Sequence, residues 1–333
     1  MARPATTIYD VAREAGVSIA TVSRVLNNPQ KVTESTRSDV LKTIEQLGFV
    51  PKAEARARAQ KSTKRIGVVT PFLTAPAYVQ RLRGVATTLA NHNYELVIYS
   101  VGSLDQLNSY LGATLLGDKF DGLIVISLQL DNKLVHRILK QRIETVLIEN
   151  HHPLLSTVEI DNLAGGRMAA EYLLKKGHQR CAFVGDKDIP EYVVYPTPQR
   201  LYGFRQVLSD ANVALPSDRV CLVPYDMEAA RQSTKGILQP SNHPTAIFAA
   251  TDLQALGVMR AARDLGLKVP QDLAVIGFDD LDMADYVGLT TICQHLDESG
   301  RIAVELLLGR LSDPSRPPQH IHLALSVIER ETA

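Results

Sequence analysis

The residues with the clearest chemistry in this 333-residue chain lie near its N-terminus, within residues 7–28. Five of them are spaced to face outward together from the start of one predicted helix: Ile19, Ala20, Thr21, Ser23 and Arg24. An arginine there can donate two hydrogen bonds to a guanine edge, and small apolar side chains can contact thymine methyl groups. The pattern therefore predicts a face that enters the major groove of double-stranded DNA.

Two short helices separated by a tight turn must position this face. Thr7 is expected to cap the first helix, with Asp10 completing a capping box. Gly16 ends that helix where a left-handed residue is needed, and Ser18 caps the second helix. A third helix, over residues 33–48, closes the small domain. The arrangement is typical of a helix-turn-helix. The competing interpretation, a helical hairpin that touches no nucleic acid, is disfavoured because caps, glycine and polar face agree.

From residue 66 onward the pattern changes to alternating strands and helices. The predicted strands are Ile66–Thr70, Glu95–Ser100, Gly122–Ser127, Thr145–Glu149, Cys181–Gly185, Ala246–Ala250 and Leu273–Phe278. The predicted helices between them include Val79–Asn91, Ala164–Lys176, Leu201–Ala211 and Leu253–Leu265. This alternation predicts parallel sheets with helices on both faces. The segment is too long for one sheet, so we expect an α/β body of two similar lobes with a ligand cleft between them.

Charge divides the chain in the same way. Residues 1–65 hold 12 Lys and Arg against 6 Asp and Glu, a net charge of +6, and the remainder nets −6. A basic head can bind the phosphate backbone while an acidic body is repelled by it. Residues 51–65 carry no large apolar side chain, so we expect a DNA-binding head at 1–50, a linker at 51–65 and a ligand-binding and dimerisation body at 66–333.

Other residue types indicate no further chemistry. Cys181 and Cys221 lie in apolar runs and fit core packing, and no Cys/His grouping has metal-ligand spacing. His151 and His152 are expected on a surface loop without ligand partners. We therefore expect no metal and no cofactor. The chain shows neither an apolar leader at its N-terminus nor a run of membrane length, so we expect a cytoplasmic protein without membrane contact.

The motifs together resemble those of the lactose-repressor/galactose-repressor family over more than nine tenths of the chain. The similar pieces include the run from Thr7 to Pro51, Phe120–Ile124, Lys176–Arg180, Arg200–Phe204, Pro244–Asp252, Val275–Asp280 and Leu289–Ile292. The resemblance implies a helix-turn-helix head and a body shaped like a type I periplasmic binding protein. It also implies a homodimer, or a dimer of dimers, that binds a near-palindromic operator with an affinity controlled by a small molecule.

Matching positions suggest roles for particular residues. Ile19, Ala20 and Arg24 would read bases. Five further residues would contact phosphates or hold the head in register on the DNA: Thr7, Ser18, Thr21, Ser23 and Asn27. In the cleft the resemblance implies effector contacts from Arg200, Asp279 and Gln294, with Tyr78, Asp161 and Asp252 as neighbours.

Each cleft assignment has a structural alternative. Asp161 and Asp252 each precede a predicted helix and can equally be helix caps. Arg200 can instead pair with an acid of the other lobe. Of Asp279 and its neighbour Asp280, one is expected to be structural and Asp279 to bind the ligand.

An arginine, an acid, an amide and an aromatic ring suit a neutral polyhydroxylated effector, most simply a sugar. A nucleobase is the second candidate and a phosphorylated co-repressor protein the third. Whether the effector releases or recruits DNA binding stays open, as does the choice between dimer and tetramer.

The linker departs from the family pattern. The resemblance places a wedging leucine and an asparagine where this chain has Arg58 and Lys52. A guanidinium is costly to desolvate between bases but suits a narrow minor groove or phosphates. We therefore expect Arg56 and Arg58 to track the DNA backbone or minor groove without intercalation.

A ligand-controlled repressor is thus the predicted function. A transport solute-binding protein would need an export signal and no basic head. An enzyme is disfavoured because the chain has no GxxxxGK[ST], HExxH or GxSxG motif.

Overall fold

The computed structural model describes residues 6–27, 29–49, 62–114, 119–239 and 243–333. These residues divide into two compact units, a small helical head and a large body that begins at residue 66. No helix among the described residues is long and apolar enough to cross a lipid bilayer.

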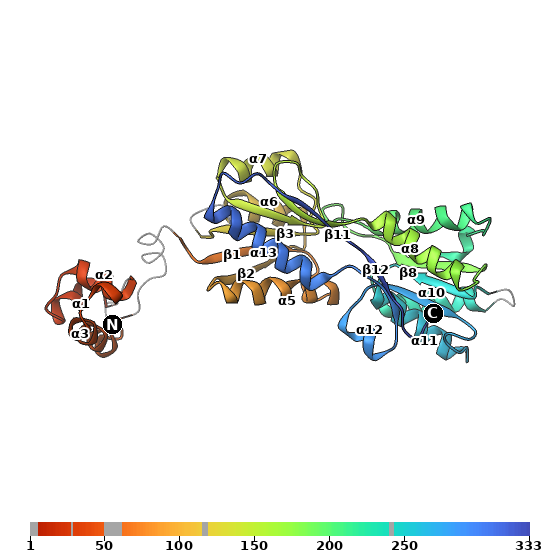
Figure 1. Cartoon of the computed structure of the whole chain (residues 1–333), viewed down its shortest axis with the longest axis horizontal. Helices are drawn as coiled ribbons and strands as arrows, with labels where there is room; N and C mark the ends of the chain where they lie inside the picture. The colour runs from red at the N-terminus through yellow and green to blue at the C-terminus, as the bar shows by residue number, and fades with distance from the viewer. Residues whose placement is uncertain (1–5, 28, 50–61, 115–118, 240–242) are drawn as a thin grey trace. The chain divides into compact units, whose positions relative to one another are not determined.

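The head contains three α-helices around a small apolar core (Figure 1). Its elements are α1 (Ile8–Glu14), α2 (Ile19–Asn27), a 3-10 turn (Pro29–Lys31) and α3 (Glu34–Leu47). Val11, Val22 and Val40, one from each helix, are fully buried against one another. Gly48 ends α3 in a left-handed conformation with φ +60°. The predicted third helix is therefore confirmed.

The first lobe of the body is built on a six-stranded sheet of order β11-β5-β4-β3-β1-β2. Its strands are β1 (Arg65–Thr70), β2 (Glu95–Ser100), β3 (Gly122–Ile126), β4 (Glu144–Ile148), β5 (Ser156–Ile160) and β11 (His320–Leu323). Its helices are α5 (Pro76–Asn91), α6 (Leu104–Ser109), a π-helical turn (Tyr110–Thr114), α7 (Asn132–Lys140) and α13 (Leu296–Ser312). The apolar faces of α5 and α13 pack on the strands in one core.

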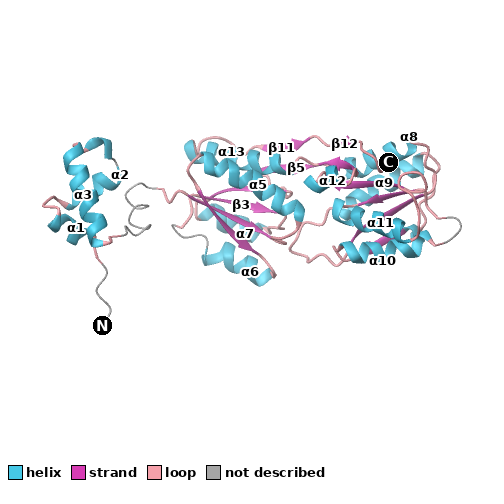
Figure 2. Cartoon of the chain, turned by 90° about the horizontal axis from the view of Figure 1, so that it is seen from below, coloured by secondary structure: helices cyan, strands magenta, loops and turns pink. Residues whose placement is uncertain are grey.

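The second lobe has a sheet of order β12-β10-β9-β8-β6-β7, in which only β12 runs antiparallel to its neighbour. Its strands are β6 (Cys181–Asp186), β7 (Val220–Val223), β8 (Ala246–Ala249), β9 (Ala274–Asp279), β10 (Thr290–Cys293) and β12 (Ser326–Ile328). Its helices are α8 (Asn162–Lys175), α9 (Thr197–Asp210), a 3-10 turn (Ser217–Arg219), α10 (Met227–Leu238), α11 (Asp252–Asp264) and α12 (Asp282–Tyr286). Figure 2 shows α10 and α11 together in this lobe, on a separate core from α8 and α9.

The chain passes between the two lobes three times. It crosses from β5 to α8, returns from β10 to α13, and crosses again from β11 to β12. The predicted two-lobed body with parallel sheets is confirmed. Five strands were not predicted: β5, β7, β10, β11 and β12. They are short or partly exposed, so they lack the continuous apolar run of a central strand.

Helices α8 and α9 approach so closely that a glycine is required between them. A Cβ added to Gly166 in α8 would lie 1.9 Å from the carbonyl oxygen of Arg200 in α9. The clash is with backbone, so a side-chain rotation cannot relieve it. Gly166 therefore sets the position of the helix turn that carries Arg200.

We predict that Gly166→Ala destabilises the body by about 1–3 kcal/mol, because the two helices must separate. Gly236→Ala is the matched control, since a Cβ at this exposed position in α10 meets nothing within 4 Å. The control should be neutral or slightly stabilising. Urea unfolding followed by circular dichroism measures both. Equal stability of the two variants would show that α8 and α9 tolerate the added methyl group.

Candidate functional site

The head presents one polar face on α2. Gly16 has φ +62°, and the hydroxyl of Ser18 accepts a hydrogen bond of 3.1 Å from the backbone N–H of Thr21, so turn and cap are as predicted. Val22 is buried beneath the helix, whereas Ile19 and Arg24 are exposed on the other side. Ala20 is exposed as well, whereas Thr21 and Ser23 are half-buried, so the predicted face is accessible mainly at Ile19, Ala20 and Arg24.

The start of α1 is also fixed by its own polar residues. The Asp10 carboxylate accepts hydrogen bonds from the N–H of Thr7 at 3.0 Å and from its hydroxyl at 2.7 Å. These bonds lower the pKa of Asp10. The side chain of Asn27, and the linker residues Arg56 and Arg58, lie outside the described residues. Their predicted DNA contacts remain predictions.

Between the two lobes of the body lies a cavity lined by residues of both. Its lining comprises Phe72, Ala77, Tyr78, Arg81, Glu149, Asp186, Ile189, Val193, Val194, Pro196, Arg200, Tyr225, Thr251, Asp279 and Gln294. Many of these follow the carboxyl ends of parallel strands, where α/β folds place their ligands.

The wall from the first lobe is held by a buried ion pair. The guanidinium of Arg81 in α5 donates to Glu149 at 2.6 Å and to the hydroxyl of Ser299 at 3.1 Å. Burial would raise the pKa of Glu149, but Arg81 and a hydrogen bond from Ser127 outweigh it and lower that pKa. One turn earlier in α5, Tyr78 packs edge-to-face on Phe72, with ring centroids 5.9 Å apart.

The wall from the second lobe holds a buried arginine over an aromatic ring. Arg200 lies 3.5 Å from the centroid of Phe278 and donates to the Asn162 side chain at 2.9 Å and the Ala250 carbonyl at 2.6 Å. Burial lowers the pKa of Arg200, and the negative charges of Asp279 and Glu149 oppose that shift. Arg200 is thus held by neutral groups of its own lobe rather than by direct pairing with an acid of the other lobe.

Asp279 ends strand β9 in an unusual backbone conformation. Its φ is +132° and that of Asp280 is +59°, backbone conformations that residues other than glycine adopt only with strain. The amide of Gln294 donates to one oxygen of Asp279 at 2.5 Å. Burial, followed by the nearby charge of Asp252, raises the pKa of Asp279 well above its usual range. Asp280 pairs instead with Arg330 at 2.9 Å and is not among the residues that line the cavity.

Three buried polar atoms on the cavity walls make no hydrogen bond to any described residue. They are Nη1 of Arg81, Oδ2 of Asp279 and Oε1 of Gln294. Leaving a buried polar group unsatisfied costs about 1–3 kcal/mol, so such groups need an explanation. The three residues line one cavity, where Arg81 can donate, Gln294 can accept, and the Asp279 carboxyl can accept or, when protonated, donate. Such a set suits a ligand with several hydroxyl groups, each of which donates and accepts.

Four of the six predicted cleft residues line the cavity: Tyr78, Arg200, Asp279 and Gln294. The other two do not. Asp161 is exposed and caps α8, accepting from the N–H of Ala164 at 2.9 Å, so its capping alternative holds. Asp252 is buried within the second lobe and accepts from the N–H of Leu281 at 2.8 Å and from the hydroxyl of Thr291. Thr251, not Asp252, caps α11.

Sequence reasoning missed Arg81, Glu149, Asp186 and Tyr225. A signal existed for three of them. Glu149 directly follows strand β4 and Asp186 ends strand β6, the edge at which ligands bind. Arg81 follows Tyr78 by three residues, so both lie on one face of α5. Tyr225 lies in a loop whose course no sequence pattern indicated.

One expectation about histidine was wrong. His151 is on an exposed loop as predicted, but it does have partners at ligand distance. Nδ1 of its ring lies 2.9 Å from a carboxylate oxygen of Glu159, and His320 lies beside both. Pairing of β11 with β5 brings His320 to this place from far along the chain, which no local spacing could indicate.

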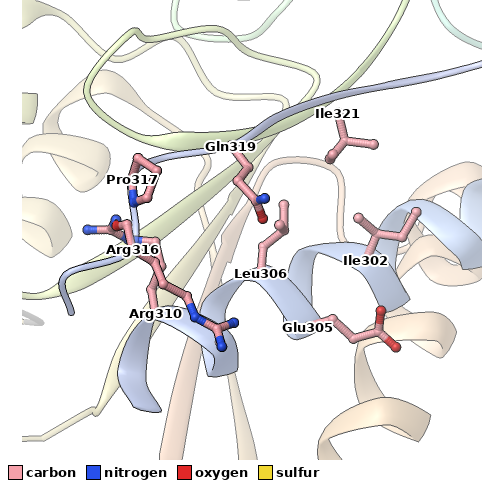
Figure 3. A pocket seen from close by; sticks show the side chains of 9 residues that line it. Ile302, Glu305, Leu306, Arg310, Arg316, Pro317, Gln319 and Ile321 are labelled. Atoms are coloured by element: carbon pink, nitrogen blue, oxygen red, sulfur yellow. The ribbon is translucent and has the colours of Figure 1, made fainter. Parts of the chain in front are cut away.

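A second hollow lies on α13 and the following segment of the first lobe. Figure 3 shows Arg310 and Arg316 beside Gln319 and the apolar side chains of Ile302 and Leu306. Arg310 pairs with Glu144 and Arg316 lies 3.6 Å from Asp313. The charges of the hollow are therefore compensated within the chain.

Known proteins resemble both the helical head and the two-lobed body. Residues 7–52 match the model of bacterial regulatory proteins of the lacI family, and residues 170–333 match a periplasmic binding protein-like domain. The Ribose operon repressor of Escherichia coli (strain K12) is 32% identical over 336 residues, covering 98% of this chain and 99% of that protein.

Two solved structures are similar over most of the chain. The lac repressor dimer bound to operator and the anti-inducer ONPF has a TM-score of 0.82 at 27% identity, covering 98% of this chain and 99% of that one. A LacI family transcriptional regulator from Enterococcus faecium with bound ribose has a TM-score of 0.70 at 27% identity, covering 81% of this chain and 98% of that one.

A helix-turn-helix head joined to a periplasmic-binding-protein-like body defines a transcription regulator rather than an enzyme. The chain belongs to the lacI family of bacterial regulatory proteins.

The variant Asp279→Asn tests the raised pKa of Asp279 through its effect on stability. Because burial raises the folded-state pKa of Asp279, the folded protein retains a proton that the unfolded chain loses above about pH 4. Wild-type stability therefore falls as pH rises through that window, and the asparagine variant escapes this loss. We predict that the variant's melting temperature, relative to wild type, increases from pH 4 to pH 7.

Asp161→Asn is the control, since asparagine caps a helix as well as aspartate. Its melting temperature should follow that of wild type across the same pH range. A constant difference between Asp279→Asn and wild type would mean that folding does not raise the pKa of Asp279.

Proposed function

We propose that this regulator represses transcription by binding an operator through the outer face of α2, under the control of a sugar bound in the cavity. The carrying observation is the set of unsatisfied buried polar atoms on Arg81, Asp279 and Gln294. A body that served only as a scaffold would gain nothing from leaving them unpaired.

A monosaccharide suits the cavity best. The cavity volume is about 70 Å³, which favours a small ligand. Tyr78 and Phe72 offer an apolar wall for a sugar ring, while Arg200 can donate to a sugar hydroxyl and the Asp279 carboxyl can accept from one or, when protonated, donate to it. The ribose-bound relative supports the same ligand class. A nucleobase is the alternative effector, and a phosphorylated co-repressor protein is a third.

Helix α5 gives the ligand a mechanical connection to the lobe boundary. Tyr78 and Arg81 face the cavity from α5, whereas Arg83 pairs with Asp282 at the start of α12 in the second lobe. Gln80 also accepts a hydrogen bond of 3.2 Å from the N–H of Asp282. A ligand that shifts α5 therefore changes contacts between the lobes, which is the differential interaction that ligand control requires.

The functional unit we propose is a homodimer on a near-palindromic operator, acting in the cytoplasm where the DNA lies. The dimeric lac repressor bound to operator supports this. Sedimentation equilibrium distinguishes the dimer from a tetramer. Arg56 and Arg58 of the linker are proposed to follow the central minor groove or phosphates. The head at 1–50, linker at 51–65 and body at 66–333 are the corresponding proposed domains.

Arg24→Ala should abolish preference for the operator while leaving the fold intact. Arg24 is exposed on α2, and a bidentate contact from arginine to guanine contributes about 1–3 kcal/mol of discrimination. Gel shifts on the chain's own upstream region and on scrambled DNA measure the preference. The control is Arg13→Ala, which removes the same charge from α1. If Arg24→Ala kept the wild-type ratio between the two DNAs, Arg24 would not read bases.

Sugars should stabilise wild type and not the cavity variants. A ligand at one hundred times its Kd adds about 2.7 kcal/mol, visible as a raised melting temperature. We predict a shift with ribose or another monosaccharide, its loss in Asp279→Ala and Arg200→Ala, and retained operator binding by both variants. Asp161→Asn should keep the shift. A shift with adenine alone would favour the nucleobase, and a shift preserved in both cavity variants would place the sugar elsewhere.

A further inference from the structure

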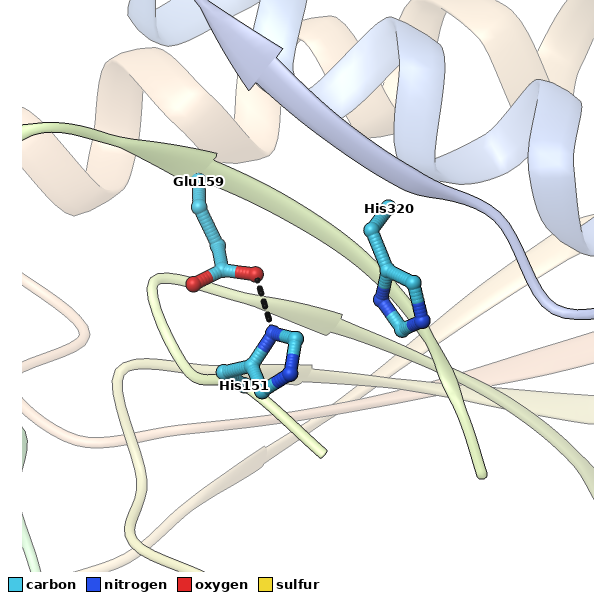
Figure 4. A group of neighbouring side chains, drawn as sticks. All are labelled: His151, Glu159 and His320. Carbon is cyan, nitrogen blue, oxygen red and sulfur yellow. Dashed lines mark hydrogen bonds and ion pairs between the residues drawn. The ribbon is translucent and has the colours of Figure 1, made fainter. Parts of the chain in front are cut away.

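One cluster of potential metal ligands lies on the first lobe, outside the cavity walls. His151, Glu159 and His320 each offer a ligand atom, and these atoms all lie within 4.8 Å of one another. Figure 4 shows the His151 ring facing the carboxylate of Glu159, with the His320 ring beside them. The side chains come from three segments: the loop after β4, strand β5 and strand β11.

Strand pairing builds this arrangement. Strands β5 and β11 are parallel, with His320 opposite Thr157 and His322 opposite Glu159. Residues two apart on a strand share a face, so Thr157 and Glu159 point the same way as His320. The loop after β4 then folds His151 over this face, with its ring centroid 4.9 Å from that of His320.

A second set of contacts holds the potential ligands in place. The Thr157 hydroxyl donates to Glu159 at 2.6 Å and lies 3.0 Å from Nδ1 of His320. Nδ1 of His151 lies 2.9 Å from the same Glu159 oxygen. Hydroxyls and carboxylates that hold the ligands of a metal typically strengthen its binding, because the side chains need not be ordered when the ion arrives.

The donor set and spacing suit a transition-metal ion. Two imidazoles and one carboxylate are a known zinc set that leaves a fourth position to water. Zinc bonds of about 2.0–2.1 Å in a tetrahedron place ligand atoms roughly 3.3 Å apart, so small side-chain rotations suffice. Calcium and magnesium prefer oxygen ligands, so two imidazoles disfavour them.

We propose that His151, Glu159 and His320 bind one Zn²⁺ ion on the first lobe. Two of the ligands lie on strands that lead into the second lobe, since β5 continues into α8 and β11 into β12. Bound metal ties the loop after β4 to both strands close to these crossings. The site is independent of the sugar proposed for the cavity.

Full-length protein without a histidine tag tests the site by titration with ZnCl₂ against a chromogenic chelator. We expect one Zn²⁺ per chain, and at least a tenfold weaker affinity in His151→Ala, His320→Ala and Glu159→Gln. Glu159→Gln preserves the size of the side chain and its hydrogen-bonding oxygen, so it covers the case in which an alanine variant fails to fold. His92→Ala is the matched control, because His92 is also exposed but precedes β2 at the opposite edge of the same sheet.

A second readout comes from Co²⁺, whose visible absorption reports imidazole and carboxylate ligation. The spectrum should appear with wild type and His92→Ala and be lost with Glu159→Gln. Absence of binding to wild type, or unchanged Zn²⁺ affinity in all three site variants, would overturn the proposal. The cluster would then be only a surface His–Glu ion pair.

Discussion

Burial of charge between the lobes is the constraint on which the rest of the body depends. Arg81, Glu149, Arg200 and Asp279 are all at or near the lobe boundary, and each is largely removed from water. The charged groups of Arg81, Glu149 and Arg200 are tolerable there only because partners surround them, whereas burial favours the protonated form of Asp279. The ion pair of Arg81 with Glu149 and the contacts of Arg200 with Asn162 and Ala250 supply those partners.

The compensation is incomplete, and its incompleteness points to function. Among the described residues, five buried side-chain atoms lack a hydrogen-bond partner, and three of them belong to residues that line the cavity: Arg81, Asp279 and Gln294. Strained backbone at Asp279 and Asp280 adds to the cost of this arrangement. Backbone strain and unsatisfied polar groups are expected at a site where a bound ligand supplies the missing hydrogen bonds. Helix α5 carries both Arg81, which lines the cavity, and Arg83, which pairs with Asp282 of the second lobe. The same helix therefore contributes to the ligand cavity and to the contacts between the lobes.

Much of this organisation was predictable from sequence, because it rests on local patterns. Caps at Ser18 and the left-handed Gly16 are short-range signals, and central strands such as β3 are continuous apolar runs. The cavity residues at strand ends were partly predictable for the same reason. The predictions that were wrong or missing concern contacts between segments that are distant in sequence. His320 reaches His151 only because β11 pairs with β5. Asp252 accepts hydrogen bonds from Leu281 and Thr291, which are also distant in sequence, so neither set of contacts could be predicted from nearby residues.

The threefold crossing of the chain has a consequence for synthesis. The first lobe is assembled from residues before 161 together with α13 and β11, which include Ala303, Val304 and Leu307 of its core. Its hydrophobic interior therefore stays open while nearly the whole polypeptide leaves the ribosome. The head can fold as soon as it emerges, but the two lobes must finish almost simultaneously at the end of translation. A nascent chain of this design presents an unfinished first lobe to chaperones for most of its elongation.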